Sequence, residues 1–316
     1  MRKEFYFRSS DGKTNIRTLA WKPNGKIKAI LQISHGMAEH IMRYNEFAEY
    51  LASHAYYVVG NDHLGHGKSV SSAKDYGHLD KKQGNDFLIQ DMHLLREKIS
   101  NEYPTLPYFI LGHSMGSTLL RYYILKYGEG LQGVLFSGIV AHQSSVLLNL
   151  GKCLSSLIGI FRGKYYRSKF LNYSVLGKYN KMMKNPQSKI DWVTRDLEKL
   201  EKYANDELSG FIFTANGYYN IFDGLLRLNN KKNISLLPKD LPMLIISGSE
   251  DPVGGFEQGI KDVYEKYKKD GVRDIALKIY EGARHELINE IDREYIYQDI
   301  DEWMTTILLD SKCLKP

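Results

Sequence analysis

The chain has 316 residues, of which 43% are hydrophobic and 25% are charged. This balance supplies enough apolar side chain for a sizeable core, and it excludes an intrinsically disordered chain, a collagen and a coiled coil. Lys and Arg number 43 against 37 Asp and Glu, an excess far below that of a dedicated nucleic-acid binder. Two cysteines, Cys153 and Cys313, exclude a disulfide framework and a cysteine-ligated zinc or iron–sulfur site. We therefore expect a globular protein with no nucleic-acid partner.

The sequence carries no recognisable export or membrane-spanning signal. Residues 1–8 lack the apolar core of a signal peptide, and no run of about 18 uncharged apolar residues occurs. We therefore predict a cytoplasmic location.

The first elements in chain order are two short strands on either side of a turn. Residues 3–8 and 15–21 flank a turn of Ser, Asp, Gly and Lys, which predicts an antiparallel hairpin at a sheet edge. Six apolar runs follow, and each predicts a buried strand: residues 29–34, 56–60, 108–111, 133–137, 243–247 and 275–280. Their continuous hydrophobicity indicates strands that are covered on both faces.

Segments with helical spacing of apolar residues separate the predicted strands. They are the segment of Phe47, Leu51 and Ala55, and residues 87–99, 117–126 and 296–307. This alternation predicts an α/β fold with a mostly parallel, doubly wound sheet. It fails between residues 142 and 224, a stretch too long for a crossover loop. We therefore predict an inserted helical cap, or lid, at residues 142–224 (the cap segment), on a core of residues 1–141 and 225–316.

The most specific motif is Gly112-His113-Ser114-Met115-Gly116, between the predicted strand at 108–111 and the predicted helix at 117–126. A G-x-S-x-G sequence between a strand and a helix is typical of a nucleophile elbow, in which the serine hydroxyl projects above the sheet. Glycines are needed there because the strained turn leaves no room for neighbouring Cβ atoms. The motif predicts that Ser114 is a nucleophile.

A base and an orienting acid must activate such a serine, and in this arrangement they follow it in the order acid, then histidine. Asp251 comes just after the predicted strand at 243–247, and His285 just after the strand at 275–280. Because ligands bind at the carboxyl ends of parallel strands, we expect Ser114, Asp251 and His285 to meet there. Glu250 competes for the acid role, and the adjacent Pro252, which fixes the local turn, favours Asp251.

Two backbone amides are candidates for an oxyanion hole. The Met115 N–H follows the nucleophile, and the Met37 N–H lies in the loop after the strand at 29–34. Gly36 lets this loop approach a bound carbonyl. Each such donor typically contributes about 3 kcal/mol to lowering the barrier.

The ordered motifs resemble the α/β-hydrolase family of monoacylglycerol lipases and lysophospholipases. They are His35-Gly-Met-Ala-Glu-His, Asp62-His-Leu-Gly-His-Gly-Lys-Ser, Gly112-His-Ser-Met-Gly, Gly248-Ser-Glu-Asp-Pro and Tyr280-Glu-Gly-Ala-Arg-His. The resemblance implies an α/β-hydrolase fold, with Ser114 as nucleophile, His285 as base and Asp251 as its partner. It also implies that Glu39 and Arg43 help to hold the polar end of the substrate pocket, and we add Gly36 and His113 to the substrate-binding candidates.

We therefore expect a serine hydrolase that cleaves a carboxylic ester of a lipid, such as a monoacylglycerol or lysophospholipid, without a metal or organic cofactor. Three alternatives stay open. The chain could be a short-chain or aromatic carboxylesterase, a serine peptidase on the same scaffold, or a non-catalytic ligand-binding relative.

The charge excess has a local origin. Residues 131–190 contain no Asp or Glu, and they carry nine basic residues: Lys152, Arg162, Lys164, Arg167, Lys169, Lys178, Lys181, Lys184 and Lys189. Aromatic and apolar residues are interleaved with them, a composition suited to peripheral contact with an anionic membrane surface. The alternative is a solvated helical cap whose apolar residues pack on the core.

Overall fold

The computed structural model describes residues 1–313, apart from the side chains of Lys231 and residues 311–313, so the Cys313 side chain lies outside the described part. An eight-stranded sheet has the order β1-β2-β4-β3-β5-β6-β7-β8. Its strands are β1 (Arg2–Arg8), β2 (Asn15–Trp21), β3 (Ala29–Ser34), β4 (Tyr56–Asn61), β5 (Tyr108–His113), β6 (Gly133–Ser137), β7 (Met243–Gly248) and β8 (Ile275–Tyr280).

The sheet confirms the predicted fold class. β1 and β2 form the antiparallel hairpin at one edge, in the register Lys3↔Ala20, and β2 pairs antiparallel with β4. All remaining pairs are parallel. β3 to β7 are buried along almost their whole length, as expected for strands covered on both faces.

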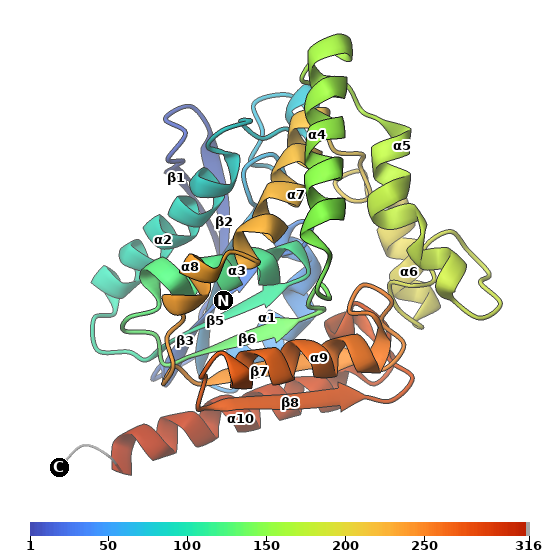
Figure 1. The fold of residues 1–316 in the computed structure, drawn as a ribbon. Helices are drawn as coiled ribbons and strands as arrows, with labels where there is room; N and C mark the ends of the chain where they lie inside the picture. The colour runs from blue at the N-terminus through green and yellow to red at the C-terminus, as the bar shows by residue number, and fades with distance from the viewer. Residues whose placement is uncertain (314–316) are drawn as a thin grey trace.

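Helices cover the two faces of the sheet and create two apolar layers (Figure 1). On one face, α1 (Asn45–Ser53) and α10 (Arg293–Cys313) bury Phe47, Ile296 and Ile300. On the other face lie α2 (Gly84–Glu102), α3 (Met115–Tyr127) and α9 (Phe256–Lys269). Both layers hold the strands rigidly, so residues at the strand ends have fixed positions.

The first predicted helix is shorter than its apolar spacing indicates. α1 ends at Ser53, and Ala55 lies outside it with φ 68°. The left-handed backbone of Ala55 ends the helix and turns the chain into β4, and the Ala55 N–H donates to the Ala52 carbonyl at 3.2 Å.

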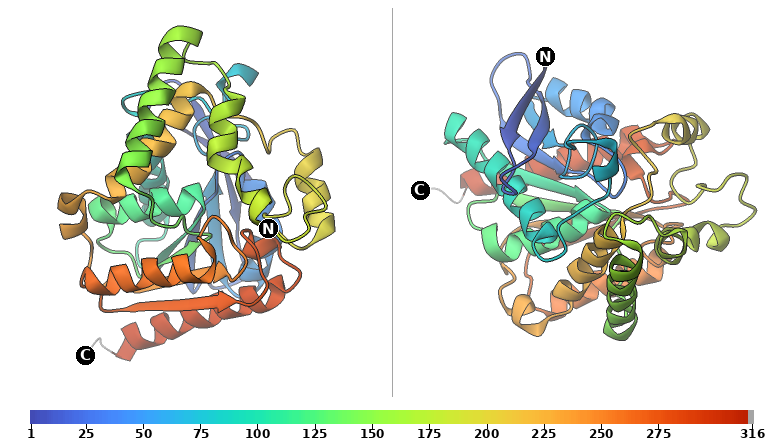
Figure 2. Two further views of the ribbon diagram at one scale, coloured as in Figure 1. Left: turned by 45° about the vertical axis from the view of Figure 1, so that its right-hand side comes forward. Right: turned by 90° about the horizontal axis from the view of Figure 1, so that it is seen from above.

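Between β6 and β7 the described residues form helices and turns but no strand. The helices are α4 (Ser145–Arg162), α5 (Lys169–Asn172), α6 (Leu197–Asn205), α7 (Ala215–Leu228) and α8 (Lys231–Ser235). α4 and α7 lie side by side and rise away from the sheet (Figures 1 and 2). α7 runs without a break through residue 224 and packs on α3 as well as α4, so it joins the cap segment to the core.

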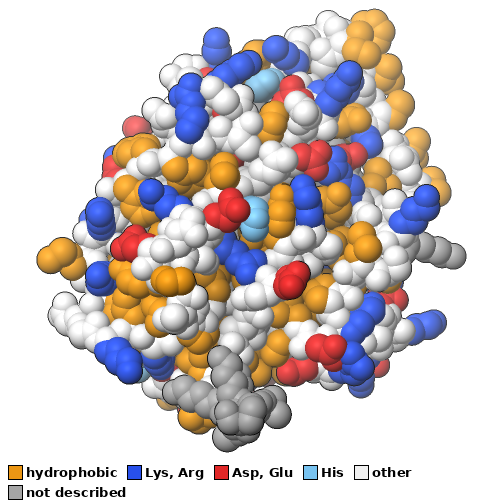
Figure 3. All heavy atoms as spheres, turned by 90° about the vertical axis from the view of Figure 1, so that its left-hand side faces the viewer, with side chains coloured by type: hydrophobic (Ala, Val, Ile, Leu, Met, Phe, Trp, Pro, Cys, Tyr) orange, Lys and Arg blue, Asp and Glu red, His pale blue; other side chains and the backbone are white. Residues whose placement is uncertain are grey.

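Charges are mixed on the face drawn in Figure 3, where Lys and Arg side chains alternate with Asp, Glu and apolar groups. Many of the ion pairs join neighbouring surface groups, such as Arg273 with Asp240 and Lys278 with Asp299. Such exposed pairs contribute little to stability. The mixture of charges seen in Figure 3 keeps that face from presenting a field of one sign.

Candidate active site

Ser114 sits at the turn between β5 and α3, with φ 52° and ψ −115°. The flanking glycines make this turn possible. A Cβ atom on Gly112 would lie 2.5 Å from the Gly116 carbonyl oxygen, and one on Gly116 would lie 2.0 Å from the Ser34 carbonyl oxygen. The close approach of α3 to β5 at Gly112 and to β3 at Gly116 therefore requires glycine at both positions, and it stabilises the strained backbone of Ser114.

His285 is paired with Asp251. The His285 Nδ1 lies 2.9 Å from Asp251 Oδ2, and both side chains are almost completely buried. The Val253 N–H donates to the other Asp251 carboxylate oxygen at 2.9 Å, whereas Glu250 is exposed to solvent. Of the two candidate acids, the structure thus brings Asp251 to His285. The His285 Nε2 has no hydrogen-bond partner within residues 1–313, which leaves it available to a substrate or to Ser114.

Electrostatics at His285 favour its protonated form. Burial alone would lower the His285 pKa, but the charge of Asp251 and the hydrogen bond to it outweigh burial, with smaller contributions from Glu286 and Glu39. The net pKa is raised above the usual value. The arrangement can therefore stabilise an imidazolium, as a general base in acyl transfer requires.

The segment that carries His285 is held by the cap segment. The His285 N–H donates to the Trp192 carbonyl at 3.3 Å, and the Glu286 N–H donates to the Val193 carbonyl at 2.7 Å. Arg284 Nη1 adds a bond to the Asp191 carbonyl at 2.6 Å. The Trp192 ring also lies 5.3 Å from the His285 ring. Sequence reasoning missed these contacts because backbone pairing over more than ninety positions leaves no local pattern.

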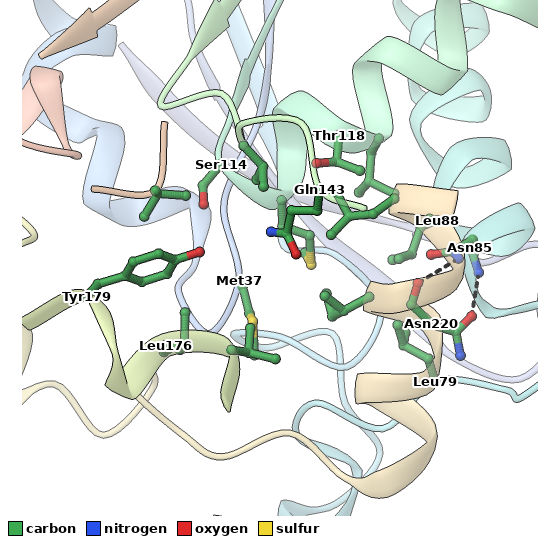
Figure 4. Close-up of a pocket in the computed structure, with 18 of the residues that line it drawn as sticks. Met37, Leu79, Asn85, Leu88, Ser114, Thr118, Gln143, Leu176, Tyr179 and Asn220 are labelled. Carbon is green, nitrogen blue, oxygen red and sulfur yellow. Dashed lines mark hydrogen bonds between the residues drawn. The ribbon is translucent and has the colours of Figure 1, made fainter. Parts of the chain in front are cut away.

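Ser114 opens into a cavity that is continuous with solvent, the two together enclosing about 680 Å³ of open space (Figure 4). Met37 and Met115 line it beside Ser114, and no Asp, Glu, Lys or Arg is among its described lining residues. Met115 opens α3, whose first amides have no partner inside the helix, and the Met37 N–H has none among the described residues. Gly36 packs against Ser114, since a Cβ there would lie 3.2 Å from Ser114 Cβ.

Helices α2 and α7 form another wall of this cavity. Asn85 and Asn220 line it and are joined by two hydrogen bonds, from the Asn85 backbone N–H to Asn220 Oδ1 at 3.1 Å and from Asn85 Nδ2 to the Asn220 carbonyl at 2.9 Å (Figure 4). The cap segment contributes Leu176, Tyr179 and Trp192. The cavity is therefore built jointly by the core and the cap segment, and its surface is mainly apolar.

Gly36, Glu39, Arg43 and His113 do not line the cavity; they lie behind it. Glu39 accepts from the Gly36 N–H, and its Oε1 also accepts from the Tyr44 hydroxyl at 2.9 Å. Arg43 Nη1 lies 2.6 Å from Glu39 Oε2. His113 is 3% exposed, with its ring 4.8 Å from the His285 ring. The structure thus places these four residues where they can hold the loops that carry Met37 and His285.

Glu286, which the sequence interpretation did not single out, completes this buried network. It binds Arg43 and accepts from Asn289 Nδ2 at 2.9 Å. Burial would raise the Glu286 pKa, but Arg43 lowers it to about 2. The Glu39 pKa is raised, first by burial and then by the neighbouring Glu286 charge, although Arg43 opposes the change. Glu286 is therefore an ionised partner of Arg43 throughout the neutral pH range.

Three further histidines cluster beside the first loop. His35 Nε2 accepts from the His63 backbone N–H at 2.9 Å, and the rings of His35 and His66 lie 5.2 Å apart. Burial lowers the pKa of His63 to about 3 and that of His66 to about 4. Within the described residues no group of three or more His, Cys, Asp or Glu side chains could hold a metal ion. These neutral rings therefore pack as part of the core.

Comparison with known proteins gives consistent matches. A family model described as "Serine aminopeptidase, S33" (Hydrolase_4) matches residues 25–292. The monoglyceride lipase homolog of monkeypox virus is 30% identical over 295 residues, covering 90% of this chain and 92% of that protein. The monoacylglycerol lipase of Mycolicibacterium smegmatis is 26% identical over 295 residues, covering 91% and 92%.

Among solved structures, the thermostable carboxyl esterase of Bacillus coagulans, in complex with glycerol, has a TM-score of 0.88 at 27% identity. The match covers 97% of this chain and 99% of that one. These matches confirm the predicted fold and the predicted resemblance to monoacylglycerol lipases. The chain belongs to the Hydrolase_4 family of α/β-hydrolases.

Proposed function

We propose that the protein is a serine hydrolase that cleaves carboxylic esters of lipids, such as monoacylglycerols or lysophospholipids, through an acyl-enzyme on Ser114. One observation carries this proposal: the His285–Asp251 pair, 2.9 Å apart, follows the strand ends at the same edge of the sheet as a strained serine that opens into an uncharged cavity. A base, its orienting acid and a nucleophile on a fixed turn are the parts that acyl transfer needs.

In the proposed mechanism, His285 takes the proton of Ser114 as the hydroxyl attacks the ester carbonyl. Asp251 stabilises the imidazolium, and the Met37 and Met115 amides stabilise the oxyanion. His285 then protonates the departing alcohol, and water hydrolyses the acyl-enzyme by the same steps. The structure describes no hydrogen bond between Ser114 and His285, and the mechanism requires none before substrate binds, because catalytic hydrogen bonds tighten in the substrate complex.

The uncharged cavity and the relatives' names support a lipid substrate. Leu79, Leu88, Leu119, Ile221 and Leu225 line the cavity beyond Ser114, so an acyl chain would exchange water for apolar contacts. The related proteins are named as monoglyceride and monoacylglycerol lipases, and these names support the same substrate class. A short-chain carboxylesterase is the second candidate, favoured by the similarity to the Bacillus coagulans enzyme.

The family description also names an aminopeptidase, which must bind the α-ammonium group of its substrate. No carboxylate is among the described residues that line the cavity, and Glu39 and Glu286 are both bound to Arg43. Burying an unpaired ammonium there would be unfavourable. This observation supports an esterase over an aminopeptidase.

Hydrolysis of p-nitrophenyl esters from acetate to palmitate, together with a monoacylglycerol and a lysophospholipid, tests the proposal. We expect kcat/KM to rise with chain length beyond acetate, and a fluorophosphonate probe to label wild-type protein but not Ser114→Ala. A maximum at acetate with no turnover of either lipid would assign the short-chain alternative. Absence of labelling in folded wild-type protein would show that the chain only binds ligands.

We further propose that the cap segment acts as a lid and contacts anionic membrane surfaces. The helix α4 is the one described helix that is long and apolar enough to cross a membrane, and 11% of it is buried. It exposes Leu147, Leu150, Ile160 and Phe161, the last of them 79% exposed. Lys152 pairs with Asp223 and Arg167 binds backbone carbonyls, which leaves seven exposed basic residues: Arg162, Lys164, Lys169, Lys178, Lys181, Lys184 and Lys189.

Apolar side chains beside cations suit a headgroup surface, to which each basic residue adds about 1 kcal/mol. Cosedimentation with phosphatidylglycerol-containing vesicles should therefore weaken as salt is raised, and Leu147→Ser with Leu150→Ser should reduce binding at every salt concentration. Lack of binding to these vesicles at low salt would contradict the membrane proposal without affecting the assignment of the hydrolase. The predicted cytoplasmic location stays a prediction.

A further inference from the structure

Tyr179 is a buried residue whose hydroxyl has no hydrogen-bond partner among the described residues. The residue lies in a short turn, Tyr179–Met182, within the cap segment and is 6% exposed. No hydrogen bond of its hydroxyl occurs within the described part of the chain, and Tyr179 lines the same cavity as Ser114. Figure 4 shows this hydroxyl directed toward the side of the cavity where Ser114 lies. A tyrosine that is otherwise buried, and whose hydroxyl meets no protein partner, presents that hydroxyl to a ligand atom or water in the cavity.

The neighbours of Tyr179 show which side of Ser114 it occupies. Its ring centroid lies 5.4 Å from that of Trp192, and Trp192 lies 5.3 Å from His285. Tyr179 thus approaches the reaction centre from the His285 side. Leu88 and Asn85 on α2 and Asn220 on α7 lie on the other side of Ser114 from Tyr179 (Figure 4).

Of the two oxygens of a bound ester, only the alkoxy oxygen is available to accept a hydrogen bond from Tyr179. The carbonyl oxygen is taken by the amides of Met37 and Met115 in the proposed mechanism. The alkoxy oxygen must lie beside His285, because His285 gives it a proton as the carbon–oxygen bond breaks. A donor on the His285 side of Ser114 therefore faces the alkoxy oxygen.

The electrostatics keep Tyr179 a donor. Burial raises the Tyr179 pKa, and the Asp251 charge raises it further, so the hydroxyl stays protonated at neutral pH. The Lys178 ammonium lies 5.3 Å from the ring centroid, where it attracts the π electrons of the ring. The neutral Tyr179 hydroxyl can therefore donate a hydrogen bond and keep its own proton.

We propose that Tyr179 is a further catalytic residue, whose hydroxyl donates a hydrogen bond to the alkoxy oxygen of the bound ester as that oxygen leaves. The carbon–oxygen bond breaks, the alkoxy oxygen takes the bond's electron pair and the proton of His285, and Tyr179 keeps its own proton. The contribution is largest when negative charge on the leaving oxygen is poorly stabilised by the alcohol itself. Tyr179 therefore adapts the site to esters of alkyl alcohols, such as glyceryl esters, in preference to aryl esters. This inference rests on the proposed esterase function.

A leaving-group comparison with Tyr179→Phe tests the inference. The two substrates share one acyl group and differ in the alcohol: p-nitrophenyl butyrate, which leaves easily, and glyceryl monobutyrate, which does not. We expect Tyr179→Phe to lower kcat/KM about tenfold for the glyceryl ester, the usual effect of losing one hydrogen bond, and to leave the aryl ester nearly unchanged. Tyr295→Phe, at an exposed tyrosine on α10, is the matched control and should change neither value.

Fluorophosphonate labelling of Ser114 in Tyr179→Phe shows whether the site is assembled. Labelling at the wild-type rate, with the selective loss on the glyceryl ester, supports the inference. Equal losses on both esters would overturn it by assigning Tyr179 to cavity shape, and no loss on either would overturn it outright. Failure of the wild-type protein to label or to cleave either ester would instead reject the proposed function.

Discussion

Arg43 binds both carboxylate oxygens of Glu286, with Nη1 2.7 Å from Oε1 and Nη2 2.5 Å from Oε2. The same Nη1 lies 2.6 Å from Glu39, whose other oxygen accepts from Gly36. One guanidinium therefore connects the loop that carries Met37 to the residue that follows His285. Because the fork of Arg is planar and rigid, this connection fixes direction as well as distance.

The negative charge of Glu286 should be visible in the pH dependence of catalysis. Burial, the largest effect, lowers the His285 pKa, and the charge of Asp251 raises it. The charge of Glu286 adds a smaller increase. A general base must be neutral, so activity rises as pH passes upward through the His285 pKa. Glu286→Gln removes a negative charge that raises the His285 pKa, so this pKa should fall. The acidic limb of the pH profile of kcat/KM should therefore move to lower pH. A limb that stays in place, or moves upward, would contradict this.

Glu250→Gln provides the control for that experiment. Glu250 is an exposed carboxylate adjacent to Asp251 and makes no contact with His285. We expect its pH profile to match that of the wild-type protein. A shift as large as that of Glu286→Gln would show that any nearby charge has the same effect.

Asp251→Asn should be far more damaging than Glu250→Gln. The amide cannot stabilise the imidazolium and favours the wrong His285 tautomer, so kcat should fall by about 10⁴-fold, as in a serine protease triad. Glu250→Gln should leave kcat unchanged, since that side chain faces solvent. Steady-state kinetics on p-nitrophenyl butyrate measures kcat for both variants. A larger loss of kcat in Glu250→Gln than in Asp251→Asn would assign the acid role to Glu250.

Two glycine substitutions should have opposite effects on stability. In Gly116→Ala the new Cβ would lie 2.0 Å from the Ser34 carbonyl oxygen, so α3 must move away from β3. We expect a loss of at least about 3 kcal/mol in the free energy of unfolding. Gly159 lies inside α4, where a Cβ would meet nothing closer than 3.6 Å. Gly159→Ala should gain about 0.5–1 kcal/mol from its helix propensity.

Urea unfolding followed by circular dichroism measures both glycine variants. If Gly116→Ala is as stable as the wild-type protein, the close approach of α3 to β3 cannot be what holds the elbow. If Gly159→Ala is destabilised, α4 must pack more tightly at this point than its open surroundings indicate.

Most of the fold and the core of the site follow from local sequence. Continuous apolar runs such as residues 243–247 predict buried strands because both faces of the sheet are covered, and the strand ends then place Asp251 and His285. The spacing of Glu39 and Arg43, four residues apart, is itself a signal for an ion pair. Glu286 gives no such signal, because its partner is 243 positions away.

The walls of the cavity were harder to predict. Tyr179 and Trp192 belong to a stretch of short turns with little regular helix, so no periodicity marks which side chains face inward. Their basic and aromatic neighbours indicate a surface rather than a pocket. Burial of Tyr179 depends on how the cap segment folds back over the sheet, which is set by tertiary packing.

The two backbone hydrogen bonds from His285 and Glu286 to Trp192 and Val193 have a consequence for engineering. A cap segment transplanted from another hydrolase in place of residues 142–224 would remove the carbonyl groups that hold the His285 segment. Chimaeras intended to exchange substrate preference should therefore retain residues 191–195 of this chain and join the foreign lid on either side of them.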